Sequence, residues 1–401
     1  MTGGRAGVSR AAAVVAATAF GAACALAVGG LADDRDWGDV GHYEVFADRI
    51  RDGEIPYRDF FVEYPPAALA SFLAPDVFGD YRLAFKLTMV TVGLAALACV
   101  VLALTRLGAT PVRAAAALGT FAVAPLALGH LVLNRYDLWP TALLVAALVA
   151  LLAERQRLAG ALLGVAFAAK VFAAAAVPVV AIRLFRTGGA RAVRTGSASF
   201  AIAAAACFVP FAVLAPGGVA YSLYSQASRP LQAETLGGSL LLALDSATAY
   251  EANLAAGLAI ELHGTTADVL GALTTVLQVA AILAVAAAYW RGPETQERFV
   301  LAFAASIAAF VAFAKVLSPQ YLVWLVPLVP LVAPTAGLVA TAILVCALVA
   351  TQLEVHGFDG LSVADWAAWT LLTRNVLLVA LFALLLRTLA RPASQLTAAA
   401  P

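Results

Sequence analysis

Ten carboxylates gather in residues 33–66, and they are the first groups in this sequence that could do chemistry. The chain has 401 residues, 63% hydrophobic and 12% charged, so 10 of its 24 acids fall in one segment. An acid at a boundary between water and membrane can act as a general base toward a hydroxyl group. For most of these acids, solvated loop charge is the simpler interpretation. They are Asp33, Asp34, Asp36, Asp39, Glu44, Asp48, Asp52, Glu54, Asp59 and Glu63.

Asp39 is the preferred candidate for a general base. It stands where the acidic segment begins, between Gly38 and the aromatic pair His42 and Tyr43. Asp36 is the second candidate, because it lies only three residues earlier. Tyr43 is a candidate substrate-binding residue beside this base.

Glu63 and Tyr64 form a second candidate because two prolines, Pro65 and Pro66, follow them. Proline fixes its own φ and restricts the residue before it to an extended conformation. The pair is therefore expected to be held rigidly at the entrance of the next helix, where it could bind substrate. A purely structural role explains the pattern equally well.

Two further candidates lie between or within apolar runs, where polar groups are costly and a functional role is the default hypothesis. Arg135 and Asp137 belong to the polar cluster 134–137; they could bind substrate or simply pair with each other. Lys170 lies about twelve residues from either charged flank. Its stem is too short to span that length to water, so we expect an outer-side partner such as a phosphate.

The last candidates lie in two polar stretches of the second half of the chain. Arg229, Gln232 and Glu234 occur together, and Lys315 precedes a helix-breaking Ser-Pro pair that is followed by Gln320. An ammonium and an amide at a break in a helix can form an anion site. We therefore expect Arg229, Lys315 and Gln320, together with Lys170, to bind a phosphate, and Glu234 to bind substrate.

Apolar runs of spanning length surround these residues and predict an all-α polytopic membrane protein. The run 158–182 has basic flanks at both ends, which predicts a hairpin of two half-length helices with Lys170 near its apex. In all we expect about twelve transmembrane helices. The runs are 11–32, 82–105, 114–133, 138–153, 158–182, 197–214, 269–290, 299–314, 322–332, 337–351 and 366–389.

Charge placement predicts that both termini are cytoplasmic. The acidic segment 33–66 and a second region, 215–268, then lie outside, with a short helix over roughly 42–52 on the membrane surface. A cleaved signal peptide is the alternative for the first run, whose length of about 22 residues instead favours an uncleaved helix. We treat 1–391 as one membrane domain and 392–401 as a disordered tail.

The composition points to no cofactor and no nucleic acid. All four cysteines lie inside apolar runs and show no metal-ligand spacing, so we expect neither disulfides nor a metal site. The net charge of +1 comes without a basic stripe of the kind that nucleic-acid binding requires.

Several stretches taken together resemble one known family. They are GDVGHYEVFADRIRDGEIPYRDFFVEYPP, NRYDLWPTALLVAALVALL, LAGALLGVAFAAK, RPLQAETLGGS and KVLSPQYLVW. In this order they are similar to glycosyltransferase family 87 of the GT-C superfamily, over about residues 36–321. The PYRDF…EYPP element is the most specific part of the resemblance.

The resemblance implies a GT-C-type membrane enzyme that uses a polyprenyl-phosphate sugar, of the alpha-1,2-mannosyltransferase or arabinosyltransferase type. It implies an outer-facing site, no metal, and an inverting displacement with a carboxylate of the first outer loop as base. Asp39 is the best match to that carboxylate. Mannose is the expected sugar, and a cell-envelope glycolipid or glycan is the expected acceptor.

A multi-pass lipid or sugar transporter is the competing interpretation. Twelve spans with both termini inside is also a transporter layout. Many transporters, however, consist of two related halves, and this sequence shows no such repeat. The long acidic loop after the first helix also has no evident use in a transporter.

Overall fold

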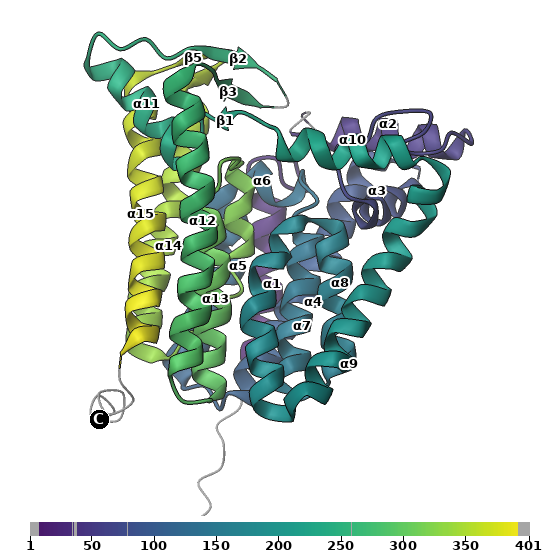
Figure 1. The fold of residues 1–401 in the computed structure, drawn as a ribbon, viewed down its shortest axis with the longest axis vertical. Helices are drawn as coiled ribbons and strands as arrows, with labels where there is room; N and C mark the ends of the chain where they lie inside the picture. The colour runs from purple at the N-terminus through teal and green to yellow at the C-terminus, as the bar shows by residue number, and fades with distance from the viewer. Residues whose placement is uncertain (1–7, 34, 36–37, 78, 258, 392–401) are drawn as a thin grey trace, which may run out of the picture. The chain divides into compact units, whose positions relative to one another are not determined.

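The computed structural model describes residues 8–33, 35, 38–77, 79–257 and 259–391. The chain forms two compact units (Figure 1). The first consists of residues 1–177 and 183–228, and the second of residues 178–182 and 229–401. Residue Asp36 and the tail 392–401, both part of the sequence predictions, lie outside the described residues.

The first unit consists of helices joined by loops, with one isolated β-bridge between Pro56 and Phe60 and no named strand among its described residues. Three of its helices start at side-chain caps: Ser9, Asp80 and Thr110 each accept a hydrogen bond from a backbone N–H in the first turn of α1, α4 and α5. The helices are α1 (Arg10–Leu26), α2 (Val40–Arg51), α3 (Leu69–Leu73), α4 (Tyr81–Arg106), α5 (Pro111–Leu128), α6 (His130–Leu133), α7 (Leu138–Leu152), α8 (Gln156–Ala169), α9 (Val177–Leu214) and α10 (Pro216–Ala227), with 3-10 turns η1 (Pro66–Ala68), η2 (Pro75–Val77) and η3 (Val171–Ala176).

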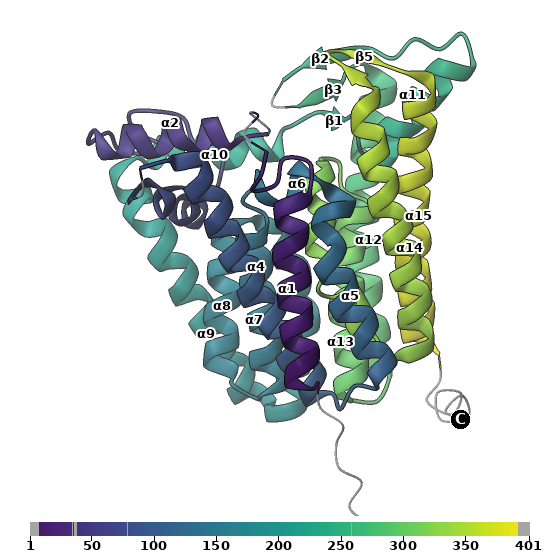
Figure 2. The ribbon, with the colours of Figure 1, turned by 180° about the vertical axis from the view of Figure 1, so that it is seen from behind.

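Two helices of the first unit lie across the ends of the others. Figures 1 and 2 show α2 and α10 running roughly at right angles to α1, α4, α7 and α8. The predicted short helix over 42–52 is therefore confirmed as α2. It buries Val40, Tyr43, Phe46 and Ala47 on one face, as an amphipathic helix does.

The predicted break at Lys170 is confirmed. Helix α8 ends at Ala169, Lys170 is extended (φ −160°, ψ 127°), and η3 and α9 follow. Helix α9 is itself two helices that meet at Gly189, whose φ is 63°. The chain therefore turns at both places that the charge pattern indicated.

The second unit combines long helices with a small sheet. Strand β3 lies between β1 and β2, antiparallel to both, with Leu231 opposite Leu262 and Leu254 opposite Leu262. The elements are β1 (Leu231–Gln232), α11 (Leu236–Ala247), β2 (Leu254–Ala256), β3 (Ile260–Leu262), α12 (Thr265–Arg291), α13 (Gln296–Ala312), η4 (Pro319–Trp324), η5 (Val329–Leu331), α14 (Pro334–Glu354), η6 (Val355–Gly357), β4 (Phe358–Asp359), β5 (Ser362–Val363) and α15 (Asp365–Ala390).

The prediction of an α-helical span over 322–332 is wrong. This segment consists of the 3-10 turns η4 and η5 with irregular backbone around them. Prolines 319, 327 and 330 remove the N–H donors that an α-helix needs at close intervals. The segment is nonetheless deeply buried, so its irregular backbone is surrounded by protein.

Six helical segments are long and apolar enough to cross a membrane, and shorter apolar helices accompany them. The six are 81–106, 111–128, 171–214, 265–291, 335–357 and 365–390. Together with the predominantly helical structure, they identify the chain as an all-α membrane protein. The number of about twelve crossings stays a prediction.

Candidate functional site

The polar turn between α6 and α7 organises the candidate site in the first unit. The Asn134 side chain donates to the carbonyl oxygens of Gly29 (2.6 Å) and His130 (3.2 Å), which fixes the turn to the end of α1. The backbone N–H of Asp39 donates to the Asn134 carbonyl at 3.4 Å. The start of α2 is thereby held against the turn.

Asp39 lies at the N-terminal end of α2, where the helix dipole favours a negative charge. Its carboxylate is about one-third exposed and forms an ion pair with Arg135. The Tyr43 hydroxyl lies 3.4 Å from the same carboxylate. The sequence did not predict that Arg135 would contact Asp39; its own suggestion was pairing within the turn.

Gly38 makes this approach possible. Its φ is +70°, and a Cβ atom at this position would lie 3.1 Å from the Asn134 carbonyl oxygen and 3.4 Å from the Arg135 guanidinium. Only glycine adopts this conformation without strain. The residue before the candidate base is therefore fixed by the turn that carries Arg135.

Asp137 and Lys170 form a second pair at the same turn. The Lys170 ammonium lies 2.7 Å from a carboxylate oxygen of Asp137; the Asp137 side chain is 2% exposed and the Lys170 side chain 14%. The ammonium also lies 4.8 Å from the centre of the Tyr136 ring. Lys170 thus has a carboxylate and an aromatic face as protein partners. The phosphate partner stays a prediction.

Tyr136 lies in the same turn, and no sequence pattern singled it out. It is 1% exposed, and its ring lies edge-on to Tyr64 at 5.1 Å and to Tyr43 at 6.0 Å. Tyr43 stacks on Phe72 at 4.3 Å. Five of the seven candidate residues of this unit are therefore ring contacts or chain neighbours of one buried tyrosine, and Asp39 contacts two of these five, Arg135 and Tyr43.

The remaining candidate, Glu63, lies next to Tyr64 and is partly exposed. Burial raises the pKa of the Tyr64 hydroxyl, and the Glu63 carboxylate adds to this effect. Burial likewise raises the pKa of Tyr43. Both hydroxyls stay protonated at neutral pH and act as hydrogen-bond donors, that of Tyr43 toward Asp39.

The loop that carries Glu63 and Tyr64 is fixed at several points. The Tyr57 hydroxyl donates to the Tyr64 carbonyl at 2.6 Å, Ser222 of α10 donates to the Val62 carbonyl at 2.7 Å, and Trp139 donates to Ala67 at 3.1 Å. Each bond joins the loop to itself or to a neighbouring helix. The rigid placement predicted from the Pro-Pro pair is therefore also supported by hydrogen bonds.

Helix α10 contacts this loop at Gly218, where a Cβ atom would overlap the carbonyl oxygen of Tyr57. We expect Gly218→Ala to separate the helix from the loop and to lower the free energy of unfolding by about 1–3 kcal/mol, because overpacked sites relax only at the expense of neighbouring contacts. Gly217→Ala is the matched control, since nothing lies within 4 Å of its Cβ position. Thermal unfolding in detergent compares the two; equal melting temperatures would contradict this prediction.

The candidates of the second unit lie near strand β1. The Gln232 backbone N–H donates to the Lys315 carbonyl at 3.1 Å, and the Gln232 side chain donates to the Glu234 carboxylate at 2.7 Å. Arg229 lies 3.5 Å from Glu261 of β3 and is 9% exposed. The structure thus brings Gln232, Glu234 and the Lys315 backbone together.

Lys315 follows α13, and its aliphatic stem lies against Gly271 of α12. Burial lowers the pKa of its ammonium, which an anionic ligand would counteract. Gln320 lies in η4 and is 8% exposed, with its side-chain oxygen buried and lacking a hydrogen bond. The Lys315 ammonium and the Gln320 amide N–H groups are donors of the kind that a phosphate site uses, whereas the buried Gln320 oxygen needs a donor of its own.

A buried network around Arg374 holds the Glu234 turn, and the sequence reasoning did not select it. The guanidinium donates to a Glu354 carboxylate oxygen at 2.8 Å and also to the Glu234 carbonyl. Asn375 donates to the same carbonyl at 3.2 Å and to Ser239 at 2.9 Å. A charge inside the apolar run 366–389 was the signal that could have found it.

Among the described residues, no group of three or more His, Cys, Asp or Glu side chains is arranged to hold a metal ion. The chemistry that these residues offer is proton transfer, ion pairing and hydrogen bonding to hydroxyl and phosphate oxygens.

The sequence model of glycosyltransferase family 87 matches residues 61–319. A search of individual curated proteins finds no match. The matched range includes Glu63, Tyr64, Arg135, Asp137, Lys170, Arg229, Glu234 and Lys315, whereas Asp39, Tyr43 and Gln320 lie outside it. Because the match covers more than half of the 401 residues, the chain belongs to glycosyltransferase family 87 and is a membrane glycosyltransferase.

Proposed function

We propose that this glycosyltransferase moves mannose from a polyprenyl-phosphate donor to a glycolipid or glycan of the cell envelope, at the outer face of the membrane. The observation that carries the proposal is the Asp39 carboxylate, about one-third exposed, between Arg135 and the Tyr43 hydroxyl. Arginine 135 stabilises the ionised carboxylate that a base requires. Tyr43, Tyr64 and Glu63 add hydrogen-bonding groups for sugar hydroxyls.

The proposed reaction is a single inverting displacement. Asp39 accepts the proton of the acceptor hydroxyl while that oxygen attacks the anomeric carbon of the donor sugar. The bond between the anomeric carbon and the phosphate oxygen breaks, and its electron pair stays on the phosphate. A phosphate leaving group needs no proton, so one carboxylate suffices where a glycosidase uses two.

Cations are needed where negative charge develops on the leaving phosphate. We propose Lys315 with Gln320, and Arg229, for this role. Asp137 neutralises Lys170, and Glu261 lies 3.5 Å from Arg229, so both cations rank behind Lys315 as phosphate ligands. Arg135, Asp137 and Glu234 are proposed to contact the sugar or the acceptor. The mechanism uses no metal and no cofactor.

The proposed orientation has both termini in the cytoplasm. Arginines 183, 186, 191 and 194 then lie on the cytoplasmic side, as the excess of basic residues in cytoplasmic loops favours. Asp137 directly precedes α7 and Lys170 directly follows α8, so both lie at the ends of these helices that are far from the four arginines. In the proposed orientation these ends are on the outer side. The first acidic loop and the substrate site share that side in this arrangement.

The test is transfer of labelled sugar by purified protein, with polyprenyl-phosphate-mannose and polyprenyl-phosphate-arabinose as separate donors and cell-envelope lipid extract as acceptor. We expect transfer from the mannose donor. Transfer from the arabinose donor alone would show that the transferred sugar is arabinose and not mannose. Transport of the donor across vesicle membranes without sugar transfer would overturn the proposal in favour of a transporter. Membership of a glycosyltransferase family does not favour the latter outcome.

Lys315 offers a test of the donor site. We expect Lys315→Ala to raise the donor KM by about tenfold or more, since loss of one charge-assisted hydrogen bond to a phosphate costs about 1.5–3 kcal/mol. Arg291→Ala is the control, because Arg291 is an exposed cation at the far end of α12. An unchanged donor KM in folded Lys315→Ala protein would remove Lys315 from the site.

A further inference from the structure

A cavity of about 550 Å³ opens at the turn between α7 and α8. Asp137 and Lys170 lie at the other ends of these two helices, which are 15 and 14 residues long. At 1.5 Å per residue the cavity is about 20 Å from that pair. It is therefore separate from the proposed transfer site in the first unit.

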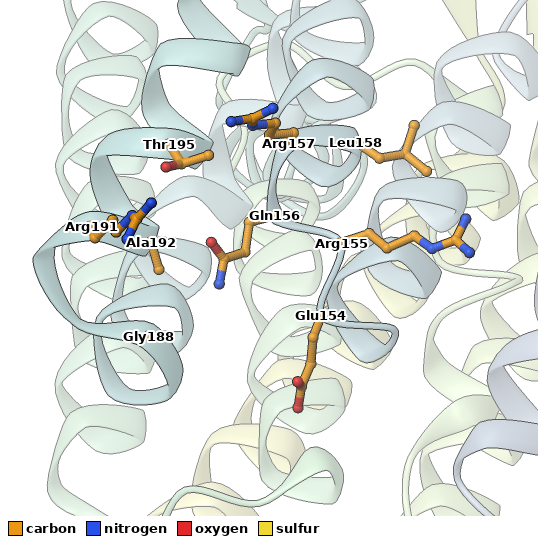
Figure 3. A pocket seen from close by; sticks show the side chains of 9 residues that line it. All are labelled: Glu154, Arg155, Gln156, Arg157, Leu158, Gly188, Arg191, Ala192 and Thr195. Carbon is orange, nitrogen blue, oxygen red and sulfur yellow. The ribbon is translucent and has the colours of Figure 1, made fainter.

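The cavity is lined by hydrogen-bond donors from α8 and α9. Figure 3 shows Gln156 and Arg157 from α8 grouped with Arg191 and Thr195 from α9 around the open space. Arg155 also lines it, and Glu154 is the single acid among the described lining residues. The three arginines and one glutamate leave a local formal charge of +2.

Neither Arg157 nor Arg191 has an ion-pair partner in the part of the chain that the structure describes. This contrasts with Arg135 and Arg374, which are paired with Asp39 and Glu354. Exposed guanidinium groups that line a cavity and outnumber its carboxylates fit an external anion.

Backbone donors face the same region. Helix α8 begins at Gln156, and no side chain caps its N-terminus. Its first N–H groups therefore have no partner within the helix, since the first bond back to Arg155 comes from Ala159. Such N–H groups and the helix dipole favour a phosphate at this position.

The walls of the cavity are fixed by backbone contact. A Cβ atom on Gly160 of α8 would overlap the carbonyl oxygen of Gly196 of α9, and one on Gly188 would lie 3.0 Å from the Gln156 side chain. The two helices therefore meet at glycine just inside the cavity. This contact holds the donors from α8 and α9 at a constant separation.

We propose that this cavity is a phosphate-binding site formed by Arg157, Arg191, Gln156, Thr195 and the N-terminus of α8. The ligand is a phosphate group, carried either by an anionic lipid headgroup or by a free phosphate ion. Under the proposed orientation it lies at the cytoplasmic membrane surface, where anionic headgroups accumulate against basic residues. The site itself does not depend on the proposed reaction.

The experiment uses purified full-length protein and the variant Arg157→Gln/Arg191→Gln. Native mass spectrometry measures retention of phosphatidylglycerol against phosphatidylcholine, and titration calorimetry in a neutral detergent measures binding of inorganic phosphate. Arg186→Gln/Arg194→Gln is the control of equal charge change, since both arginines lie on α9, as Arg191 does, but do not line the cavity.

We expect the cavity variant to lose its preference for the anionic probe by about tenfold, or about 1.4 kcal/mol, and the control to keep it. Selective retention of phosphatidylglycerol identifies a lipid headgroup as the ligand, and phosphate binding without lipid preference identifies a free ion. Equal losses in the cavity variant and the control would show only general attraction to a basic surface and would overturn the proposal. So would binding of neither probe by the unmodified protein.

Discussion

Asp39→Asn is expected to reduce sugar transfer by about 10²- to 10⁴-fold, the usual contribution of a general base. The replacement keeps the size of the side chain and its place at the start of α2 but removes the basic oxygen. The loss is expected in kcat/KM for the acceptor, with little change in thermal stability. Initial rates of labelled mannose transfer at saturating donor provide the measurement.

Asp52→Asn is the control for this prediction. Asp52 lies at the other end of α2 and is exposed, so it tests for general effects of removing a loop carboxylate. Activity that survives in Asp39→Asn would move the base elsewhere, and Asp36 is the next acid to replace. Equal losses in both variants would mean that the loop charge as a whole matters and that no single base exists.

The ion pair between Asp39 and Arg135 bears on how this variant is interpreted. An arginine beside a carboxylate can position a substrate oxygen or can simply stabilise the loop. If the pair is structural only, Asp39→Asn and Arg135→Gln should lower the melting temperature together and reduce activity by similar factors. If Asp39 is the base, its loss should reduce activity far more than the loss of Arg135.

The pattern of charged and apolar residues predicted those features of the fold that depend on whether a segment contacts water or lipid. The hairpin apex at Lys170 followed from two basic flanks around one apolar run, and the structure breaks the helix at that residue. The surface helix followed from the spacing of apolar residues in 42–52. Both are local consequences of where charges and apolar side chains can lie.

The pattern could not predict contacts between residues that are far apart in the chain. Asp39 meets Arg135 and Glu354 meets Arg374 only after the helices have packed. Tyr136 has no distinguishing spacing, yet its ring contacts Tyr43 and Tyr64. The span expected over 322–332 failed because hydropathy records apolar length and ignores the missing N–H donors of proline.

The second large effect is expected at Arg374, which is fully buried and lies in a span. Its guanidinium connects Glu354 of α14 to the Glu234 carbonyl beside β1. Arg374→Met would leave the Glu354 carboxylate without its cation, and removing one partner of a buried ion pair costs about 3–5 kcal/mol. We expect a marked fall in the melting temperature in detergent.

The double variant Arg374→Met/Glu354→Gln distinguishes the effect of an unpaired buried charge from the effect of losing the hydrogen bonds of Arg374. It removes the unpaired carboxylate, so most of the lost stability should return, because apolar replacement of a buried pair is often close to neutral. Arg387→Met, an exposed arginine on the same helix, should change little. If stability returns in the double variant while transfer stays low, the network acts by holding the Glu234 turn. If transfer returns as well, the ion pair is needed only for folding, and Glu234 keeps its position through Asn375 alone.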